Sequence, residues 1–254
     1  MPRQAKDIRP RSQQIAADLR ALITAGDQAP GTKLQSTQQL MDRFSVTSQT
    51  VQNALGILKA EGYIEGRPGK GVYVRETQQE TITPGDYAQP RGAGQPYAWI
   101  TEATRRGQSG GSMLLDVAEV EAPAQVAKAF GLDPADLVVK RTQVLTLDDQ
   151  PAELAHLYYP AKIARGTALA ERRKIRGGSP AVLAGLGLEP EKFEDVISTR
   201  PPTVEEFIAL ELPQEVPILR TFRVARTADG RPVEAQVLAK AGHRHELRYR
   251  WPMP

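Results

Sequence analysis

The 254-residue sequence contains no cysteine and only three histidines, His156, His243 and His245. Without cysteine there are no disulfides, thiolate metal sites or cysteine nucleophiles. Three histidines leave little for a histidine-based metal site or catalytic triad. No stretch approaches the roughly 18 apolar residues that a membrane helix needs, and the first residues lack the apolar region of a secretory signal. We therefore expect a cytoplasmic protein without a metal, a cofactor or a membrane partner.

The composition, with 40% hydrophobic and 25% charged residues, is that of a folded protein. Its length allows one large domain or two ordinary ones. The formal net charge of +3 is unevenly distributed, because residues 1–75 carry +5 and the remainder carries −2. A basic front on a near-neutral body is typical of a chain that meets a polyanion at one end, although ordinary surface scatter can produce the same asymmetry.

Three helices are predicted within the basic front. Apolar residues recur at helical spacing over 12–25. A second short helix is predicted over 36–44, with Ser36 as its N-cap. Only two residues then separate it from a third helix that begins at Thr47 or Ser48.

The third helix carries uncharged hydrogen-bonding side chains opposite its apolar stripe, namely Ser48, Gln49, Gln52 and Asn53. Gln and Asn can pair with adenine in the major groove, while Ser and Thr contact phosphates. A plain solvent-exposed helix face has the same composition. The DNA-binding interpretation therefore depends on the residues that follow.

Those residues predict a hairpin with a cationic tip. Two β-prone runs, 62–65 and 72–74, flank a Gly-rich turn that contains Arg67, Gly69 and Lys70. The turn lacks the G-x-x-x-x-G-K-[ST] pattern of a P-loop. A wing whose tip lies on phosphates or in the minor groove fits it better.

Three helices followed by a basic wing form a winged helix-turn-helix, and these residues resemble the N-terminal domain of GntR-family bacterial transcription regulators. The resemblance rests on Ile15-Ala16, Pro30-Gly31, Lys33-Leu34, Ser36, Phe44, Val46-Thr47, Thr50-Val51, Ala54-Leu55, Glu61-Gly62 and Gly69 to Val74. It implies DNA contacts from the second and third helices and from the wing. The predicted DNA-binding residues are Lys33, Ser36, Gln38, Thr47, Ser48, Gln49, Thr50, Gln52, Asn53, Arg67, Gly69 and Lys70.

At three positions where the family usually has Arg, this chain has Gln38, Ser48 and Gln52. Fewer cations predict a weaker salt dependence of DNA binding and the loss of the usual Arg-to-guanine contact. We therefore expect an operator that is richer in A·T than the family's common one. The basic residues near the N-terminus, Arg3, Lys6, Arg9 and Arg11, are expected to supply phosphate contacts.

Composition divides the chain into a DNA-binding domain at 1–75, a Pro-, Gly- and Gln-rich linker at 76–96 and a body at 97–254. In the body, strands are predicted near 113–120, 137–147, 152–159, 192–199, 217–227, 232–240 and 245–251. Helices are predicted near 123–130, 179–186 and 203–211. Asp-rich turns at 148–151 and 229–232 lie between β runs and indicate antiparallel hairpins. The expected fold class is α+β, with an antiparallel sheet in the body.

The body contains an internal duplication in which a helix, a strand, a turn and a strand recur from Pro123 and again from Pro202. Two such halves side by side predict a ligand cleft between them.

The body resembles the UTRA effector-binding domain, which is similar in fold to chorismate lyase and marks the HutC subfamily of GntR regulators. The residues that carry the resemblance are Pro123, Ala127, Leu132, Val139, Arg141, Asp148-Asp149, Pro151, Tyr158-Tyr159-Pro160, Thr203, Glu205-Glu206, Val216 to Leu219 and Asp229 to Glu234. The resemblance implies a homodimer formed through the body and a small-molecule effector that changes the spacing of two DNA-binding heads.

The branch that senses amino-sugar phosphates has two Arg before the Asp turn and a Glu after it, where this chain has Gln143, Leu145 and Ala155. This difference disfavours an amino-sugar phosphate and predicts a less anionic effector, or none. The polar candidates that remain for effector binding are Arg141, His156, Tyr158, Arg223 and Glu234. Each of them is also compatible with a strand residue on a solvent face.

The sequence thus predicts a regulator that binds double-stranded DNA at a pseudo-palindromic operator, a repressor more than an activator, released by a small molecule. Two alternatives stay open. One is a ligand-independent dimeric repressor, for example of a mobile element. The other is an enzyme with a DNA-binding head, which is disfavoured because no nucleophile–base pair is visible and no catalytic residue is predicted.

Overall fold

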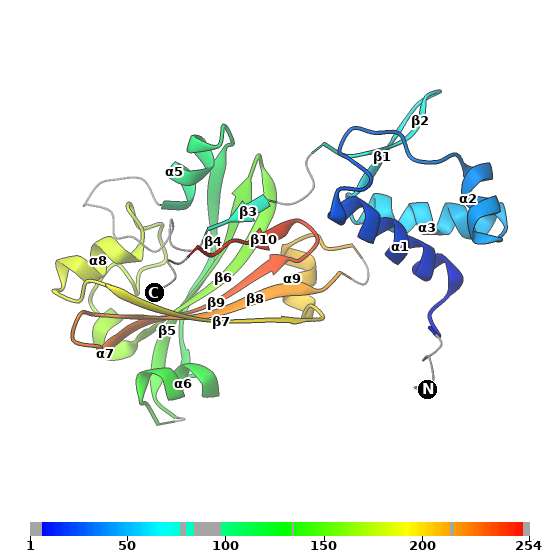
Figure 1. The fold of residues 1–254 in the computed structure, drawn as a ribbon. Coiled ribbons are helices and arrows are strands. Elements are labelled where there is room, and N and C mark those ends of the chain that lie inside the picture. Colours follow the sequence, from blue (N-terminus) through cyan, green and yellow to red (C-terminus); the bar gives the residue numbers. More distant parts are fainter. Residues whose placement is uncertain (1–6, 77–79, 84–97, 134, 214–215, 251–254) are drawn as a thin grey trace. The chain divides into compact units, whose positions relative to one another are not determined.

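The chain divides into two compact units, Met1–Glu80 and Thr81–Pro254, in a computed structural model that describes residues 7–76, 80–83, 98–133, 135–213 and 216–250 (Figure 1). Most of the predicted linker at 76–96 lies outside these residues, so its boundaries stay a prediction. No helix in the described ranges is long and apolar enough to cross a membrane.

The N-terminal unit is the predicted winged helix-turn-helix. It consists of α1 (Arg11–Ala25), α2 (Thr37–Phe44), α3 (Ser48–Ala60), β1 (Ile64–Arg67) and β2 (Gly71–Val74). Gly26 ends α1 in the left-handed conformation, with φ of 84°. The core consists of helix residues at i, i+3 and i+4 spacing, among them Leu40, Val51 and Leu58, which are completely buried.

The body is built on one antiparallel sheet of six strands in the order β4-β5-β6-β9-β8-β7. The strands are β4 (Gly110–Glu121), β5 (Leu137–Leu147), β6 (Gln150–Pro160), β7 (Lys192–Arg200), β8 (Ile218–Arg226) and β9 (Pro232–Ala241). They confirm the predicted α+β class and the two hairpins. At the first hairpin turn, Asp148 and Asp149 both have positive φ, a conformation that Asp tolerates better than most residues.

The predicted duplication is visible as two hairpins, β5–β6 and β8–β9, and one cavity is lined by residues of both halves, among them Glu153 and Arg223. The halves join edge to edge, because β6 and β9 pair from Glu153 with Lys240 to Tyr158 with Ala235. The sheet is therefore continuous across this junction.

Short elements cover the sheet. They are α5 (Ala98–Arg105), α6 (Ala124–Phe130), α7 (Ala161–Ala164), α8 (Ser179–Gly185), α9 (Val204–Ala209), β3 (Glu80–Ile82) and β10 (His245–Leu247). The chain at α6 and α9 packs on one face, through Val126 and Leu210. We call the other face the α8 face; it packs against α7 and α8 and against Ile82 of β3.

Four of these elements depart from the predictions. The helices α5 and α7 were not predicted, and β3 lies within the predicted linker, where it pairs with β10. The strand β10 is also shorter than the strand predicted at 245–251. For α7, β3 and β10 the physical reason is length, since elements of three or four residues carry too little periodicity to be recognised.

Candidate DNA interface and effector cavities

The polar face of α3 is exposed, as its pattern predicted. Ser48, Gln49, Gln52 and Asn53 are all exposed, while Val51 on the opposite face is completely buried. All three of the amides are already hydrogen bonded. Gln49 Nε2 donates to Asn53 Oδ1 at 2.9 Å, and Gln52 Nε2 donates to Thr37 Oγ1 at 3.2 Å. These side chains would therefore have to break the present hydrogen bonds before they could bind the edge of a base in the major groove.

Other predicted contacts around α2 and α3 also have structural partners. Ser36 and Thr47 cap the two helices, and their hydroxyls accept from the backbone N–H of Gln39 and Thr50. Gln38 Nε2 donates to Asp42 Oδ1 at 3.0 Å, which places a carboxylate next to this predicted DNA contact.

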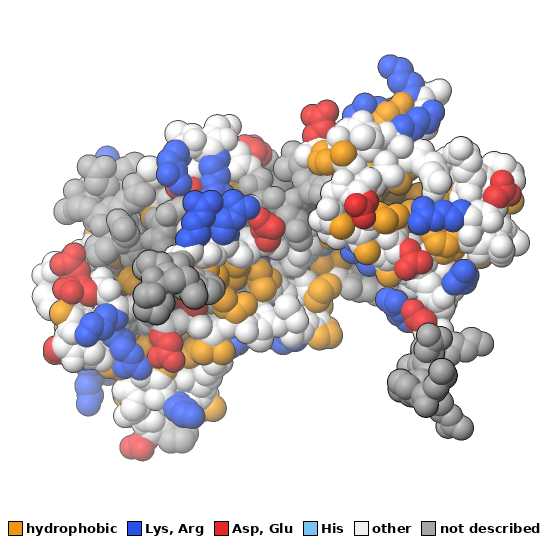
Figure 2. All heavy atoms as spheres, in the orientation of Figure 1, with side chains coloured by type: hydrophobic (Ala, Val, Ile, Leu, Met, Phe, Trp, Pro, Cys, Tyr) orange, Lys and Arg blue, Asp and Glu red, His pale blue; other side chains and the backbone are white. Residues whose placement is uncertain are grey.

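The wing concentrates cations, and Figure 2 shows Lys and Arg side chains at the tip of the β1–β2 hairpin. Arg67 donates to Glu65 at 3.0 Å and lies over the Tyr73 ring at 4.4 Å from its centroid. Lys33 pairs with Tyr73 through an isolated bridge, and its Cε lies 2.8 Å from where a Cβ on Gly71 would be. Lys70 is exposed beside Gly69, whose φ of 72° forms the turn. Lys33, from the segment between α1 and α2, thus lies beside the hairpin that carries Arg67 and Lys70.

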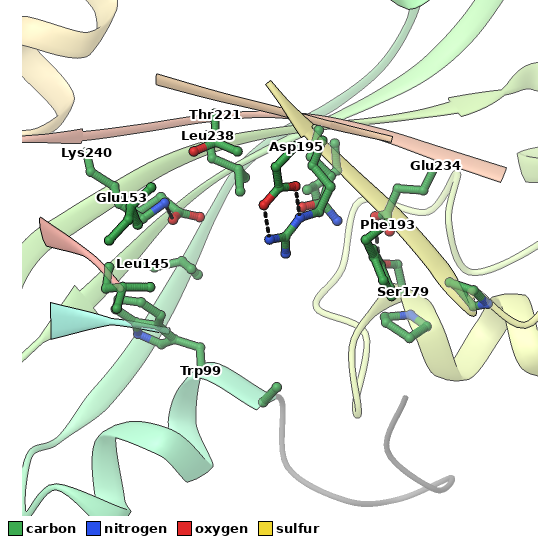
Figure 3. A pocket seen from close by; sticks show the side chains of 18 residues that line it. Trp99, Leu145, Glu153, Ser179, Phe193, Asp195, Thr221, Glu234, Leu238 and Lys240 are labelled. Carbon is green, nitrogen blue, oxygen red and sulfur yellow. Dashed lines mark hydrogen bonds and ion pairs between the residues drawn. The ribbon is translucent and has the colours of Figure 1, made fainter. Parts of the chain in front are cut away.

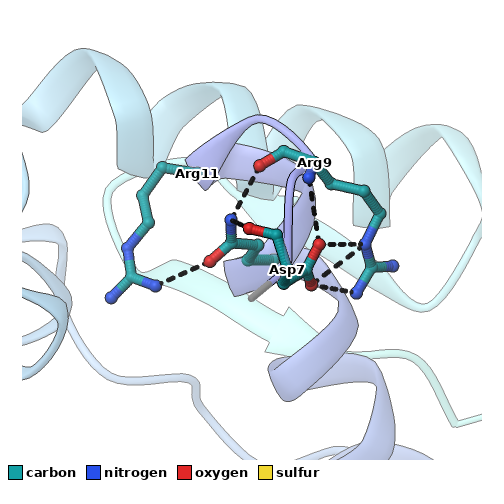
Figure 4. A network of polar contacts seen from close by, with 4 residues as sticks. Asp7, Arg9 and Arg11 are labelled. Atoms are coloured by element: carbon teal, nitrogen blue, oxygen red, sulfur yellow. Dashed lines mark hydrogen bonds and ion pairs between the residues drawn. The ribbon is translucent and has the colours of Figure 1, made fainter. Parts of the chain in front are cut away.

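The expected phosphate contacts from the N-terminal arm are not preformed (Figure 4). Arg9 binds Asp7 at 2.7 Å, and this guanidinium holds the pKa of Asp7 at about 2. Arg11 donates to Gln14 Oε1 at 2.9 Å and to the Phe44 carbonyl at 3.3 Å. Arg3 and Lys6 lie outside the described residues. Arg9 and Arg11 are therefore engaged within the domain, and their contacts with phosphates stay a prediction.

In the body, the five predicted effector residues do not form one site, because they lie on two faces of the sheet. The register pairs Thr142 with His156 and Arg141 with Leu157, so Arg141 and His156 point to opposite faces. His156 and Tyr158 share the face that α6 and α9 cover. There His156 lies 3.2 Å from Thr142 and 3.5 Å from Glu205, and burial lowers its pKa.

Arg223 and Glu234 line a cavity of about 70 Å³ on the α8 face, here called the inner cavity (Figure 3). Arg223 is buried and Asp195 is half-buried, and they form a bidentate ion pair with two contacts of 2.7 Å. Glu153 and Lys240 form a second buried ion pair in the same wall. Every cation of the inner cavity therefore already has a carboxylate partner.

Glu234 is the remaining carboxyl group of the inner cavity, and it is completely buried. It accepts from the hydroxyl groups of Tyr159 at 2.5 Å and Ser179 at 2.9 Å. Burial raises the pKa of Glu234, while these hydrogen bonds oppose the shift.

Arg141 lines a second and larger cavity of about 450 Å³, the outer cavity, which shares Leu157 and Ser179 with the inner one. Its guanidinium is fully engaged in holding the loop that follows α7. It donates to the carbonyls of Leu169 at 2.9 Å, Glu171 at 2.8 Å and Arg173 at 2.7 Å. Arg141 thus holds this loop while it lines the cavity, and its direct contact with an effector stays a prediction.

Several residues of the two cavities were not predicted from the sequence, namely Ser112, Lys174, Arg176, Ser179, Asp195 and Lys240. Lys174 and Arg176 belong to a basic run, Arg172 to Arg176, that charge patterning could have identified. Among the described residues no group of three or more metal-ligating side chains lies together.

Comparisons with known proteins agree with this architecture. The family model of the UTRA domain matches residues 105–246, and that of the bacterial regulatory proteins of the gntR family matches residues 11–74. An uncharacterized HTH-type transcriptional regulator of Streptomyces coelicolor is 27% identical over 252 residues, 96% of this chain and 94% of the relative. The HTH-type transcriptional repressor NagR of Bacillus subtilis is 24% identical over 59% of this chain and 58% of its own length.

The fold is likewise that of solved regulators. The crystal structure of PhnF from Mycobacterium smegmatis aligns with a TM-score of 0.57 and 20% identity, covering 94% of this chain and all of PhnF. The matched families and relatives are transcription regulators, not enzymes. The chain therefore belongs to the GntR family of bacterial regulatory proteins, in its HutC-like branch, and is a transcription regulator with a winged helix-turn-helix DNA-binding domain and a UTRA effector-binding domain.

Proposed function

We propose that the protein is a dimeric repressor that leaves a pseudo-palindromic operator when a small molecule binds on the α8 face of the UTRA sheet. The observation that carries this proposal is the position of Ile82. This residue follows the last strand of the wing, which ends at Val74, by eight positions and lines the inner cavity.

Ile82 is held firmly against the body. It is 4% exposed and packs with Trp99, Leu145 and Ala152. The backbone N–H of Arg248 donates to the Ile82 carbonyl at 2.9 Å, and the neighbouring Thr81 hydroxyl donates to Glu246 at 2.5 Å. A ligand that alters the wall of this cavity changes the anchor of the segment that leads from the DNA-binding domain. Differential affinity for two anchor states is what couples ligand binding to DNA release.

Direct reading of the operator is assigned to Gln49, Gln52 and Asn53 of α3, and phosphate binding to Lys33, Arg67 and Lys70 on the wing. Amides without Arg on α3 favour adenine over guanine at the central contacts. Selection from random DNA should therefore return half-sites with A·T at these contacts. Gln52→Ala should relax the base preference at one position, whereas Lys70→Ala should weaken binding to all sequences. Selection of guanine at the key contact would contradict this assignment.

The homodimer contact is proposed at β7 and α9. The outer strand β7 exposes Val196 by 50%, and α9 exposes Val204 by 78% and Ile208 by 68%. A bidentate ion pair of Arg200 with Glu206, at 2.7 and 2.8 Å, joins the two elements. Two such surfaces related by a two-fold axis are self-complementary, since the outer strands can pair antiparallel.

Light scattering during size exclusion tests the dimer. The double variant Val196→Lys, Ile208→Lys should run as a monomer, while Met113→Lys, Leu115→Lys on the other outer strand, β4, should remain dimeric. Dissociation of the second variant alone would place the contact at β4.

Titration of the operator complex against a metabolite panel tests the function as a whole. The operator itself comes from footprinting on DNA upstream of the protein's own coding region. Release by at least one compound supports the proposal. An operator complex that no compound changes would instead identify a ligand-independent repressor, and turnover of a compound would identify an enzyme.

A further inference from the structure

The outer cavity differs from the inner one in its charge. Its lining contains three basic residues, Arg141, Lys174 and Arg176, and no acidic residue. In the inner cavity, by contrast, three carboxyl groups face two cations, and both cations are paired. The positive potential on the α8 face is therefore concentrated in the outer cavity.

Only two of the three cations are available to a ligand. Arg141 uses its guanidinium to bind the carbonyls of the loop before Lys174. Lys174 and Arg176 are exposed, and neither side chain has a hydrogen-bond or ion-pair partner among the described residues. Their neighbours Arg172 and Arg173 are instead paired with Asp116 and Glu171. The loop thus neutralises its outward cations and leaves those of the cavity unpaired.

The rest of the lining is uncharged. Ser112, Gln143 and Ser179 supply hydroxyl and amide groups, and Ile100, Leu114, Leu157 and Ile175 supply apolar surface. Its volume of about 450 Å³ lies within the range of small-molecule sites. A polar and partly apolar ligand body with one acidic end matches this lining.

We propose that the effector is a small organic anion whose acidic group, a carboxylate or a phosphate, binds Lys174 and Arg176. This inference deepens the proposed function and rests on it. Gln143 and Leu145, in place of two arginines, predicted a less anionic effector. In the structure Leu145 lies in the inner cavity, and cations reach the outer cavity from the loop after α7 instead.

Ser179 connects this site with the inner cavity. Its hydroxyl donates to Glu234 at 2.9 Å, and the residue lines both cavities. A ligand group that accepts a hydrogen bond from Ser179 would take this donor from the buried carboxyl group. Binding in the outer cavity is thereby communicated to the inner cavity, where Ile82 lies.

The test uses the full-length protein and three probes: inorganic phosphate, malonate and neutral glycerol, each at about 10 mM and constant ionic strength. The variant Lys174→Gln, Arg176→Gln removes the proposed anchor. Its matched control, Lys128→Gln, Lys162→Gln, removes two exposed cations from elsewhere in the body. Calorimetry and the thermal midpoint report binding.

At least one anion should bind the native protein and the control with equal affinity. Its affinity for the Lys174 and Arg176 variant should be about tenfold lower. Preference for phosphate or for malonate identifies the acidic group. Stabilisation by glycerol alone, no anion binding, or equal anion binding to both variants would overturn the proposal.

Failure of this proposal is distinguishable from failure of the proposed function. Release of the operator by a neutral or cationic metabolite, unchanged in the Lys174 and Arg176 variant, refutes the anionic effector and leaves the repressor intact. Anion binding at this site without release of the operator by any compound would confirm the anion site and contradict the proposed release of the repressor by a small molecule.

Discussion

At the scale of single residues, Arg141 shows how a predicted binding residue also has a structural role. It is 4% exposed, and one guanidinium satisfies several carbonyls of a loop without regular structure. Leaving a buried carbonyl without its hydrogen-bond donor lowers the stability of the folded protein by about 1–3 kcal/mol. The loop that carries Lys174 and Arg176 therefore depends on this residue.

We predict that Arg141→Ala lowers the free energy of unfolding of the UTRA domain by about 2–4 kcal/mol. Both tryptophans of the chain, Trp99 and Trp251, belong to this domain, so their fluorescence during urea denaturation reports it selectively. Arg172→Ala is the control, because this exposed ion pair contributes under about 1 kcal/mol. Equal, small losses in both variants would mean that the carbonyl contacts of Arg141 do not stabilise the domain.

His243 gives the protein a pH dependence with a defined sign. Neither ring nitrogen has a hydrogen-bond partner among the described residues, and burial lowers the pKa of His243 to about 4. Between pH 6.5 and 4 the unfolded chain therefore binds a proton that the folded chain does not. Stability is complete above pH 6.5 and declines as the pH falls through this window.

We expect the native protein to lose about 2 kcal/mol of stability through His243 between pH 7.5 and pH 5. His243→Phe should reduce the pH-dependent loss by this amount, measured by urea denaturation at the two pH values. The same loss in the variant and in the native protein would show that His243 titrates normally.

At the scale of elements, α3 contains a glycine in its interior that the fold does not require. Gly56 is exposed, and an added Cβ would have no atom within 4 Å. Gly26 has equally open surroundings, but its φ of 84° is unfavourable for a residue with a side chain. The two glycines thus differ in backbone conformation and not in space.

Gly56→Ala should therefore stabilise the DNA-binding domain by about 0.5–1 kcal/mol, and Gly26→Ala should destabilise it. The helical circular dichroism of the full-length protein, followed during thermal unfolding, measures both. A lower thermal midpoint for Gly56→Ala would contradict this prediction and indicate that a side chain at this position is not accommodated.

Element-level prediction succeeded where the period of a pattern was long enough. The stripe of α3 and the alternating strands on either side of the Asp148-Asp149 turn fixed their elements in advance. The effector residues could not be grouped in the same way, because strand alternation assigns a face only when the register is known. One step of register decides whether His156 shares a face with Arg141 or with Thr142.

At the scale of the whole molecule, regulation requires that ligand binding on the UTRA sheet change the DNA affinity of the DNA-binding domain. Ile82 is the described apolar residue that combines the two requirements, since it lies just beyond the DNA-binding unit and lines the inner cavity. Ile82→Ala shortens the side chain that anchors β3 among Trp99, Leu145 and Ala152. Loss of a buried Ile side chain typically weakens packing by about 2–5 kcal/mol.

The weakened anchor should leave operator affinity within about twofold of native and raise the effector concentration for half-release about tenfold. Fluorescence anisotropy of labelled operator measures both quantities in one titration. Leu137→Ala is the control, because this leucine of β5 is 40% exposed and lines neither cavity. An unchanged half-release concentration would show that β3 does not transmit the effect of the ligand, and the proposed contact between subunits would then be the next candidate.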